Sequence, residues 1–197
     1  MEQVDVLRRA IEVLEQLNIT YMVGGSIACS VYGEPRATLD IDVVVDLRPD
    51  QIRMLCEAFP PDEWYVSEEA VREAVAARDM FNVIHGASGN KIDFIVAKKD
   101  PWGRQQMAHR RRVRILPDCE GYAAAPEDII ISKMAYYRQG GHEKHLRDIT
   151  GILKTSDEPV DRAYIAQWAE QLGLTEIWQA ILRRVGQTGK GLPEGAA

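Results

Sequence analysis

The chain has 197 residues, of which 46% are hydrophobic and 27% charged, and its formal net charge is −6. This length and composition suit one compact domain, or one domain with a small helical appendage. The negative charge argues against a protein that grips nucleic acid over a broad surface, although it leaves room for a local basic patch.

The cysteines and the apolar segments exclude further classes of protein. Cys29, Cys56 and Cys119 are odd in number, far apart and without a Cys-x-x-Cys pair, so we expect reduced thiols and neither a disulfide set nor a zinc site. No apolar run reaches the roughly 18 residues of a membrane-spanning helix, and the N-terminus carries acids where a signal peptide would be apolar. We therefore expect a soluble, cytoplasmic protein with no membrane partner.

The N-terminal segment, residues 2–17, is predicted to form an amphipathic helix. Apolar side chains recur in it at helical spacing, with charged ones between them: Val4, Leu7, Ile11 and Leu14. We expect this helix to pack on the sheet behind the segment that follows.

A short buried strand over residues 21–23 leads into Gly24 and Gly25. Glycine tolerates positive φ and has no side chain, so the backbone can turn sharply here and approach a ligand closely. Ser26 then opens an apolar run, residues 27–31, that predicts a helix with Ser26 near its N-cap. The free N–H groups of such a helix start can bind phosphate.

Two acids follow on a second predicted strand, residues 39–45. Because residues two apart on a strand face the same side, Asp40 and Asp42 are expected to point together. The side chains expected to point into the core are Leu39, Ile41 and Val43. Adjacent carboxylates repel one another, and a divalent cation removes that cost. The alternatives to a site for metal and phosphate are an ordinary turn and a solvated strand edge.

The middle of the chain supplies a third acid. Short helices are predicted over 50–58 and 67–77, and residues 80–85 and 91–97 form two strands of a hairpin. Asp93 lies in the second of these strands among apolar residues, where an unpaired carboxylate would be costly. Either a salt bridge or a role as a third metal ligand would explain it.

A basic strand comes next, after a short helix predicted over 101–107. The alternation of residues 110–116 places Arg110, Arg112 and Arg114 on one face. This basic strip either protects a sheet edge from pairing with another chain or holds triphosphate or an RNA backbone.

From residue 126 onward the pattern is helical. Pro126 and the two acids after it suit a helix start, and Lys133 lies next to the apolar stripe of this helix. Lys133 either extends its ammonium to solvent or has a function. Further helices are predicted over 142–154 and, as a pair, over 161–185.

The segment His142-Glu143-Lys144-His145 is similar to a zinc-protease motif, but its second histidine comes one position early, so we exclude that activity. The predicted organisation is an α/β core over residues 1–123, a helical part packed on it over 124–186, and a flexible tail over 187–197.

The two halves of the chain together resemble the nucleotidyltransferase superfamily of polymerase β-like fold. Its pattern is Gly-Gly-Ser, a spacer, Asp-hydrophobic-Asp, and a third acid on a neighbouring strand. The matching stretches are Gly24-Gly25-Ser26, Asp40-Ile41-Asp42 and Lys91-Ile92-Asp93. Residues 127–135 and Leu146-Arg147-Asp148-Ile149 are similar to the third and fourth motifs of AbiEii-type nucleotidyltransferases. The resemblance covers residues 19–153, and it departs in a longer spacer before Asp40 and in a single Asp after Arg147.

The resemblance implies an α+β fold, with a mixed β-sheet and flanking helices followed by a C-terminal helical bundle. It implies transfer of a nucleoside monophosphate from a nucleoside triphosphate to a hydroxyl acceptor, by in-line displacement at the α-phosphorus with two Mg²⁺ ions, or Mn²⁺ in their place. The residues that it assigns to phosphate binding are Gly24, Gly25, Ser26 and Lys133. The residues that it assigns to catalysis are Asp40, Asp42, Asp93, Lys133 and Asp148, and the first three of these are the metal ligands. Asp148 would orient Lys133 or serve catalysis.

The resemblance leaves the acceptor open between a tRNA end, a protein hydroxyl and a small molecule. Members are often toxins of two-gene bacterial systems, which would imply an antitoxin partner. Two alternatives share the fold: a non-catalytic nucleotide-binding or regulatory module, and an antibiotic adenylyltransferase that differs in its acceptor pocket.

Overall fold

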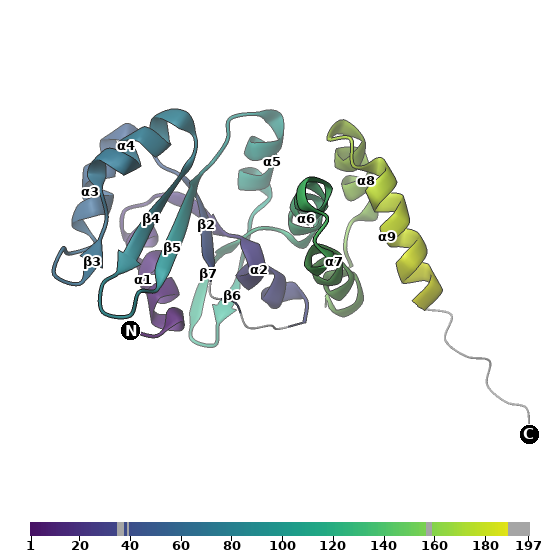
Figure 1. Ribbon diagram of the computed structural model, residues 1–197, viewed down its shortest axis with the longest axis horizontal. Coiled ribbons are helices and arrows are strands. Elements are labelled where there is room, and N and C mark those ends of the chain that lie inside the picture. The colour runs from purple at the N-terminus through teal and green to yellow at the C-terminus, as the bar shows by residue number, and fades with distance from the viewer. Residues whose placement is uncertain (35–37, 39, 157–158, 189–197) are drawn as a thin grey trace, which may run out of the picture. The chain divides into compact units, whose positions relative to one another are not determined.

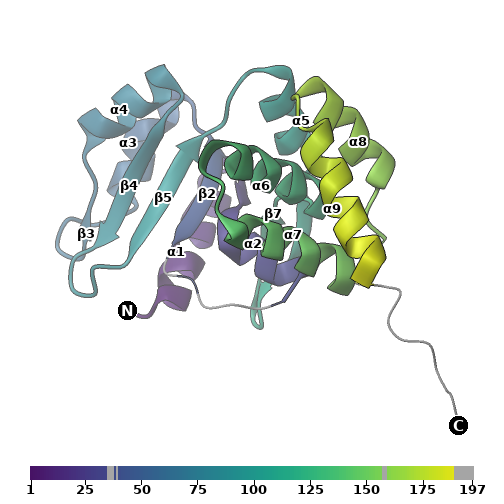
Figure 2. The same ribbon diagram turned by 45° about the vertical axis from the view of Figure 1, so that its right-hand side comes forward.

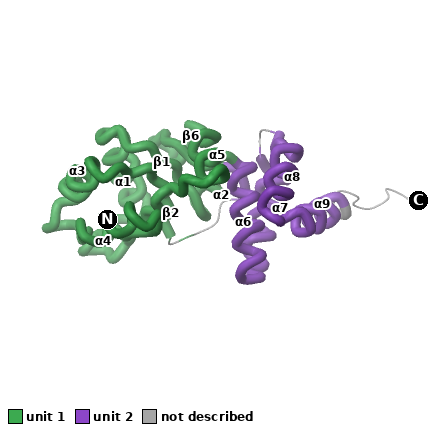
Figure 3. Tube along the Cα trace, turned by 90° about the horizontal axis from the view of Figure 1, so that it is seen from above, with its two compact units in different colours: residues 1–31, 35–125 green, residues 32–34, 126–197 purple. Residues whose placement is uncertain are grey.

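The computed structural model describes residues 1–34, 38, 40–156 and 159–188, and the chain divides into two compact units. Residues 1–31 and 35–125 belong to the first unit, and residues 32–34 and 126–197 to the second (Figure 3). The division after residue 125 lies close to the boundary predicted after residue 123. Leu39 and residues 189–197 of the predicted tail lie outside the described residues.

The elements up to residue 125 are a mixture of helices and strands (Figure 1). In chain order they are α1 (Gln3–Gln16), β1 (Thr20–Val23), α2 (Gly25–Tyr32), β2 (Ile41–Asp46), the 3₁₀ helix η1 (Pro49–Gln51), α3 (Ile52–Glu57), β3 (Trp64–Tyr65), α4 (Glu68–Ala77), β4 (Met80–His85), β5 (Lys91–Val96), α5 (Pro101–His109), β6 (Arg111–Leu116) and β7 (Cys119–Ala123). Ser67 caps α4 as its position predicts, because its side chain accepts a hydrogen bond from the Ala70 N–H.

The described strands form one mixed sheet in the order β3-β4-β5-β2-β1-β7-β6. β2 pairs with β5 and β1 with β7 in parallel, and the other neighbours are antiparallel. The predicted mixed sheet with flanking helices is therefore confirmed. The two-residue strand β3 was not predicted, because a segment so short shows no periodicity; Trp64 pairs there with His85.

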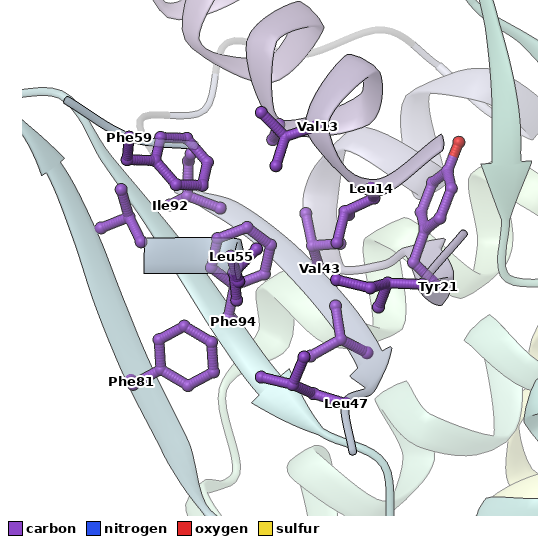
Figure 4. Packing of buried hydrophobic residues seen from close by; sticks show 14 of the residues in the cluster. Val13, Leu14, Tyr21, Val43, Leu47, Leu55, Phe59, Phe81, Ile92 and Phe94 are labelled. Carbon is purple, nitrogen blue, oxygen red and sulfur yellow. The ribbon is translucent and has the colours of Figure 1, made fainter. Parts of the chain in front are cut away.

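The core of the first unit lies between one face of the sheet and the helices α1, α3 and α4. Val13 and Leu14 of α1 are fully buried, and Phe94 of β5 stacks on Phe81 of β4 with ring centroids 5.2 Å apart (Figure 4). Val4 was expected in the buried stripe of α1 with Leu7 but is 44% exposed, and Val6 faces the core in its place. Burial of these side chains is the main stabilising contribution.

The same packing decides which face of the sheet the acids occupy. The core-facing residues of β2 and β5 are Ile41, Val43, Val45, Ile92, Phe94 and Val96, all of them buried. Since successive residues of a strand point to opposite faces, Asp42 and Asp93 lie on the face opposite this core.

The second unit is helical where it is described, with α6 (Pro126–Gly140), α7 (Glu143–Thr155), α8 (Arg162–Gln171) and α9 (Thr175–Thr188) (Figure 2). Two buried acids of α6 hold the start of α8: Glu127 Oε1 accepts from the Asp161 N–H at 3.0 Å, and Asp128 Oδ1 accepts from the Tyr164 hydroxyl at 2.8 Å. No helix within the described ranges combines the length and apolar character that a bilayer crossing requires.

Candidate functional site

The glycine turn between β1 and α2 is in direct contact with β2. The Gly24 N–H donates to the Asp42 carbonyl oxygen at 2.9 Å, and Gly25 has a φ of +56°. A Cβ on Gly25 would lie 1.9 Å from Asp42 Oδ2. Only glycine fits this position, because it accepts the left-handed backbone and leaves space for the carboxylate. Helix α2 begins at Gly25, so Ser26 lies in its first turn, close to the N-cap near which it was predicted.

Asp42 and Asp93 are register partners on the parallel strands β2 and β5. Neighbouring strands are about 4.8 Å apart, so the two carboxylates project side by side from the same face of the sheet. Asp93 is buried, with 7% of its surface exposed. Two adjacent carboxylates, one of them buried, require a compensating cation or hydrogen-bond donors.

Lys91 supplies a cation to this pair. Its Nζ lies 2.9 Å from Asp93 Oδ1 and 2.7 Å from Oδ2, and the Asn82 side-chain amide also donates to Oδ1. The hydrogen bond to Asp93 raises the pKa of Lys91, and the charges of Asp93, Asp40 and Asp42 raise it further. The salt bridge that the sequence allowed for Asp93 is therefore present.

Asp40 lies just outside the strand on which it was expected. The ladder between β2 and β5 begins with Ile41 opposite Ile92, so Asp40 precedes β2 and is exposed. Its backbone N–H donates to Thr38 Oγ1 at 3.3 Å. Asp40 is nevertheless close enough for its charge to act on Lys91.

The donor chemistry of this corner fits a divalent cation. Carboxylate oxygens are the ligands that Mg²⁺ and Mn²⁺ prefer, and Asp42 and Asp93 present them from adjacent strands beside a glycine turn without side chains. Within the described part of the chain, no three Asp, Glu, His or Cys side chains are gathered closely enough to hold a metal by themselves. Asp42 and Asp93 are the pair that the sheet brings together, and Asp40 lies just before the start of β2.

Lys133 and Asp148 form an ion pair inside the second unit. The Lys133 Nζ lies 2.6 Å from Asp148 Oδ2, and the two side chains are 8% and 7% exposed. The interpretation in which Lys133 extends its ammonium to solvent is therefore wrong, because α7 covers it and supplies its partner. Helices α6 and α7 pack along each other, which brings together residues 15 positions apart.

His145 lies near this ion pair and was overlooked in the sequence. Its ring stacks on Tyr136 with centroids 5.8 Å apart, and its Nδ1 is buried without a hydrogen-bond partner among the described residues. Burial lowers the pKa of His145, and the charges of Lys133 and Lys144 lower it further. The only sequence feature that drew attention to His145 was its place in the excluded zinc-protease motif.

Two arginines of the basic strip, Arg112 and Arg114, lie on β6, which is an edge of the sheet, whereas Arg110 precedes the strand and ends α5. Arg112 is close to two acids, at 3.4 Å from Glu15 and 3.6 Å from Glu120. The Arg110 guanidinium lies over the Tyr122 ring at 4.6 Å from its centroid. Part of the positive charge of the strip is therefore compensated within the first unit.

Comparison with known proteins identifies the fold. No family model and no curated protein matches the sequence. Among solved structures, a nucleotidyltransferase-like protein from Paracoccidioides brasiliensis aligns with a TM-score of 0.56 and 19% identity over 92% of each chain. ANT(2")-Ia in complex with adenylyl-2"-tobramycin aligns with a TM-score of 0.53 and 13% identity, over 92% of this chain and 98% of that one. The chain therefore has the nucleotidyltransferase fold, and no match bears on the AbiEii-type resemblance.

Proposed function

We propose that this chain is a metal-dependent nucleotidyltransferase that moves a nucleoside monophosphate from a nucleoside triphosphate to a hydroxyl acceptor. The observation that carries the proposal is the contact of the Gly24-Gly25 turn with Asp42, whose strand neighbour is Asp93. A glycine turn, which would let a ligand approach closely, thus contacts one of two adjacent carboxylates, on a fold that the chain shares with nucleotidyltransferases.

In this reaction the acceptor oxygen forms a bond to the α-phosphorus, and the bond from that phosphorus to the bridging oxygen of the β-phosphate breaks. Pyrophosphate leaves with the electron pair, and the acceptor proton passes to Asp93 or to water. Asp42 and Asp93, with Asp40 beside them, would hold Mg²⁺ or Mn²⁺. A bound divalent cation would neutralise triphosphate charge and lower the pKa of the acceptor hydroxyl.

The residues around the acids position the substrate. Gly24, Gly25 and Ser26 let the start of α2 bind the triphosphate through backbone N–H groups. The AbiEii-type resemblance further assigns Lys133 to a nucleotide phosphate, with Asp148 fixing its orientation. In such transfers, positioning and charge neutralisation account for most of the catalysis.

The variant Asp42→Asn tests the proposal, because it keeps the side-chain shape and removes one charge. We expect it to abolish transfer, and to raise the melting temperature in chelator by relieving repulsion with Asp93. Mg²⁺ with ATP should stabilise the wild type by mass action and the variant much less. Asp46→Asn, on the same strand but exposed, is the matched control. A variant that responds to Mg²⁺ and ATP as the wild type does would contradict the metal site.

The acceptor is identified by incubating the protein with each labelled triphosphate, Mg²⁺ and a cell extract. Label on tRNA, on a protein or on a small molecule assigns the acceptor class, and binding of nucleotide without any transfer would favour the regulatory module. An antibiotic adenylyltransferase is the second candidate, favoured by the fold shared with ANT(2")-Ia. It predicts adenylylation of tobramycin by the purified protein.

A toxin of a two-gene system is the biological role that the resemblance suggests, with an antitoxin as partner. Expression of the wild type should then arrest growth, whereas expression of Asp42→Asn should not. Growth arrest by both proteins would separate toxicity from nucleotidyl transfer.

A further inference from the structure

The carboxylate proposed as a metal ligand on β5 is already occupied on both oxygens. Lys91 Nζ lies within 2.9 Å of Asp93 Oδ1 and 2.7 Å of Oδ2, and Asn82 donates to Oδ1 as well. The Asp93 side chain is 10% exposed, whereas that of Lys91 is 44% exposed. The ion pair thus joins a buried acid to a base that reaches it from the solvent side.

An ammonium and a divalent cation on the same carboxylate repel each other strongly. A Mg²⁺ ligand distance is about 2.1 Å, so a metal on Asp93 would lie within a few ångströms of the Lys91 Nζ. Repulsion between cations at this separation is substantial beside a buried carboxylate. The two therefore compete for Asp93.

We propose that Lys91 is an internal counter-ion of the aspartate cluster, and that a divalent metal binds by displacing its ammonium from Asp93. The inference rests on the proposed function, since it concerns the same metal. It predicts that Lys91 stabilises the metal-free protein and, by the same contact, weakens metal binding.

The two partners differ in their freedom to move. Lys91 is the first residue of β5 and carries a flexible stem of four carbons, so its ammonium can turn to solvent at small cost. Asp93 lies in the middle of a strand that is paired on both sides, and Asn82 holds it from β4. The lysine is therefore the partner that leaves.

The charge of Lys91 also acts on the neighbouring acids. Asp42 is the register partner of Asp93, and Asp40 is close enough to interact with Lys91 electrostatically. Loss of the ammonium removes one positive charge from beside these carboxylates, which favours a metal and disfavours the empty site. If the role of Lys91 were purely structural, its removal would lower stability without tightening metal binding.

The test titrates the nucleotide-free protein with Mn²⁺ and with Mg²⁺ by calorimetry, and measures melting temperatures in chelator and in metal. Lys91→Met removes the charge and keeps most of the stem, and Lys91→Gln retains a hydrogen-bond donor for Asp93. Lys99→Met, exposed beyond the other end of β5, is the matched control. We expect both Lys91 variants to melt lower in chelator and to bind metal on the order of tenfold more tightly, a hydrogen bond to a charged group contributing at least that much.

The outcomes separate this inference from the proposed function. Normal metal binding by the wild type with unchanged affinity in both Lys91 variants overturns the role of Lys91 alone. Absence of metal binding in the wild type and in both Lys91 variants overturns the metal site as well. Variants that are unfolded in chelator and fold when Mn²⁺ is added support the inference, because the metal then replaces the lysine. Variants that stay unfolded in metal overturn it.

Discussion

The carboxylate of Asp42 occupies the space that a Cβ of Gly25 would need, 1.9 Å from Oδ2. Any side chain at Gly25 must therefore displace the acid, in addition to adopting a φ of +56°. The geometry of the proposed metal ligand and the conformation of the Gly24-Gly25 turn, proposed to bind phosphate, are thus coupled through a single contact.

Gly25→Ala should destabilise the protein by about 2 kcal/mol or more and abolish transfer, because left-handed strain and overpacking add together. Gly24→Ala is the matched control, since the nearest atom that its Cβ would meet among the described residues is the Asp42 carbonyl oxygen at 3.8 Å, an ordinary contact. In an Asp42→Ala background the cost of Gly25→Ala should fall to about 1 kcal/mol, which leaves the strain alone. Urea unfolding of the four variants measures this coupling, and an equal cost in both backgrounds would refute it.

Lys133→Met should destabilise the second unit by about 3 kcal/mol, since it leaves the buried Asp148 carboxylate without its ammonium. Asp148→Asn should be costly for the same reason, whereas the double change to Met and Leu should recover most of the stability. Denaturant unfolding of the wild type, the single variants and the double variant measures these changes in unfolding free energy.

The catalytic role assigned to Lys133 predicts a further result in folded protein. Transfer should fall about 100-fold or more in Lys133→Met, because a charge donor to the triphosphate is lost. The double variant at Lys133 and Asp148 should be little slower than Lys133→Met or Asp148→Asn alone, as for residues that act as a unit. Full activity in folded Lys133→Met would confine the functional resemblance to the sheet.

His145 should make stability depend on pH. Its pKa is lowered from 6.5 in the folded protein, mainly by burial, so the unfolded chain takes up a proton first as pH falls. The contribution of the neutral His145 to the free energy of unfolding is fully present above pH 6.5. It is lost as pH decreases from there toward the lowered pKa. His145→Phe keeps the stacking on Tyr136 and should show a smaller loss of unfolding free energy over this range. Parallel pH slopes for the two proteins would contradict the burial effect.

Replacement of Arg112 and Arg114 by alanine should promote self-association, because exposed charges on the edge strand β6 oppose pairing with a second chain. Sedimentation at increasing concentration measures it, with Arg53→Ala/Arg72→Ala on exposed helix surfaces as the control of equal charge. The RNA interpretation of the strip predicts instead weaker RNA retention at low salt with a flatter salt dependence. That result without any change in association would refute edge protection.

Periodicity and turn residues were sufficient to predict most elements of both units. The alternation around Ile41 and Val43, and the apolar run around Asp93, identified two buried strands that carry acids. The register that makes Asp42 and Asp93 neighbours could not be read from the sequence, since about fifty residues separate the strands and pairing at that distance is decided by packing.

The remaining differences between the sequence predictions and the structure have local causes. Asp40 falls outside β2 because the ladder with β5 begins at Ile41, and strand ends are poorly marked by side-chain pattern. The contact between Lys133 and Asp148 depends on how α6 packs on α7, which a helical stripe indicates but does not specify.

The parallel pairing of β1 with β7 joins Val23 to Ala123, a hundred residues later in the chain. The hairpins β4–β5 and β6–β7 can form early from local contacts, but β1 keeps an open edge until β7 has been synthesised. Such non-local pairing slows folding and exposes unpaired backbone in the meantime. A nascent or truncated chain that ends before β7 would therefore present that edge to other molecules and be prone to aggregate.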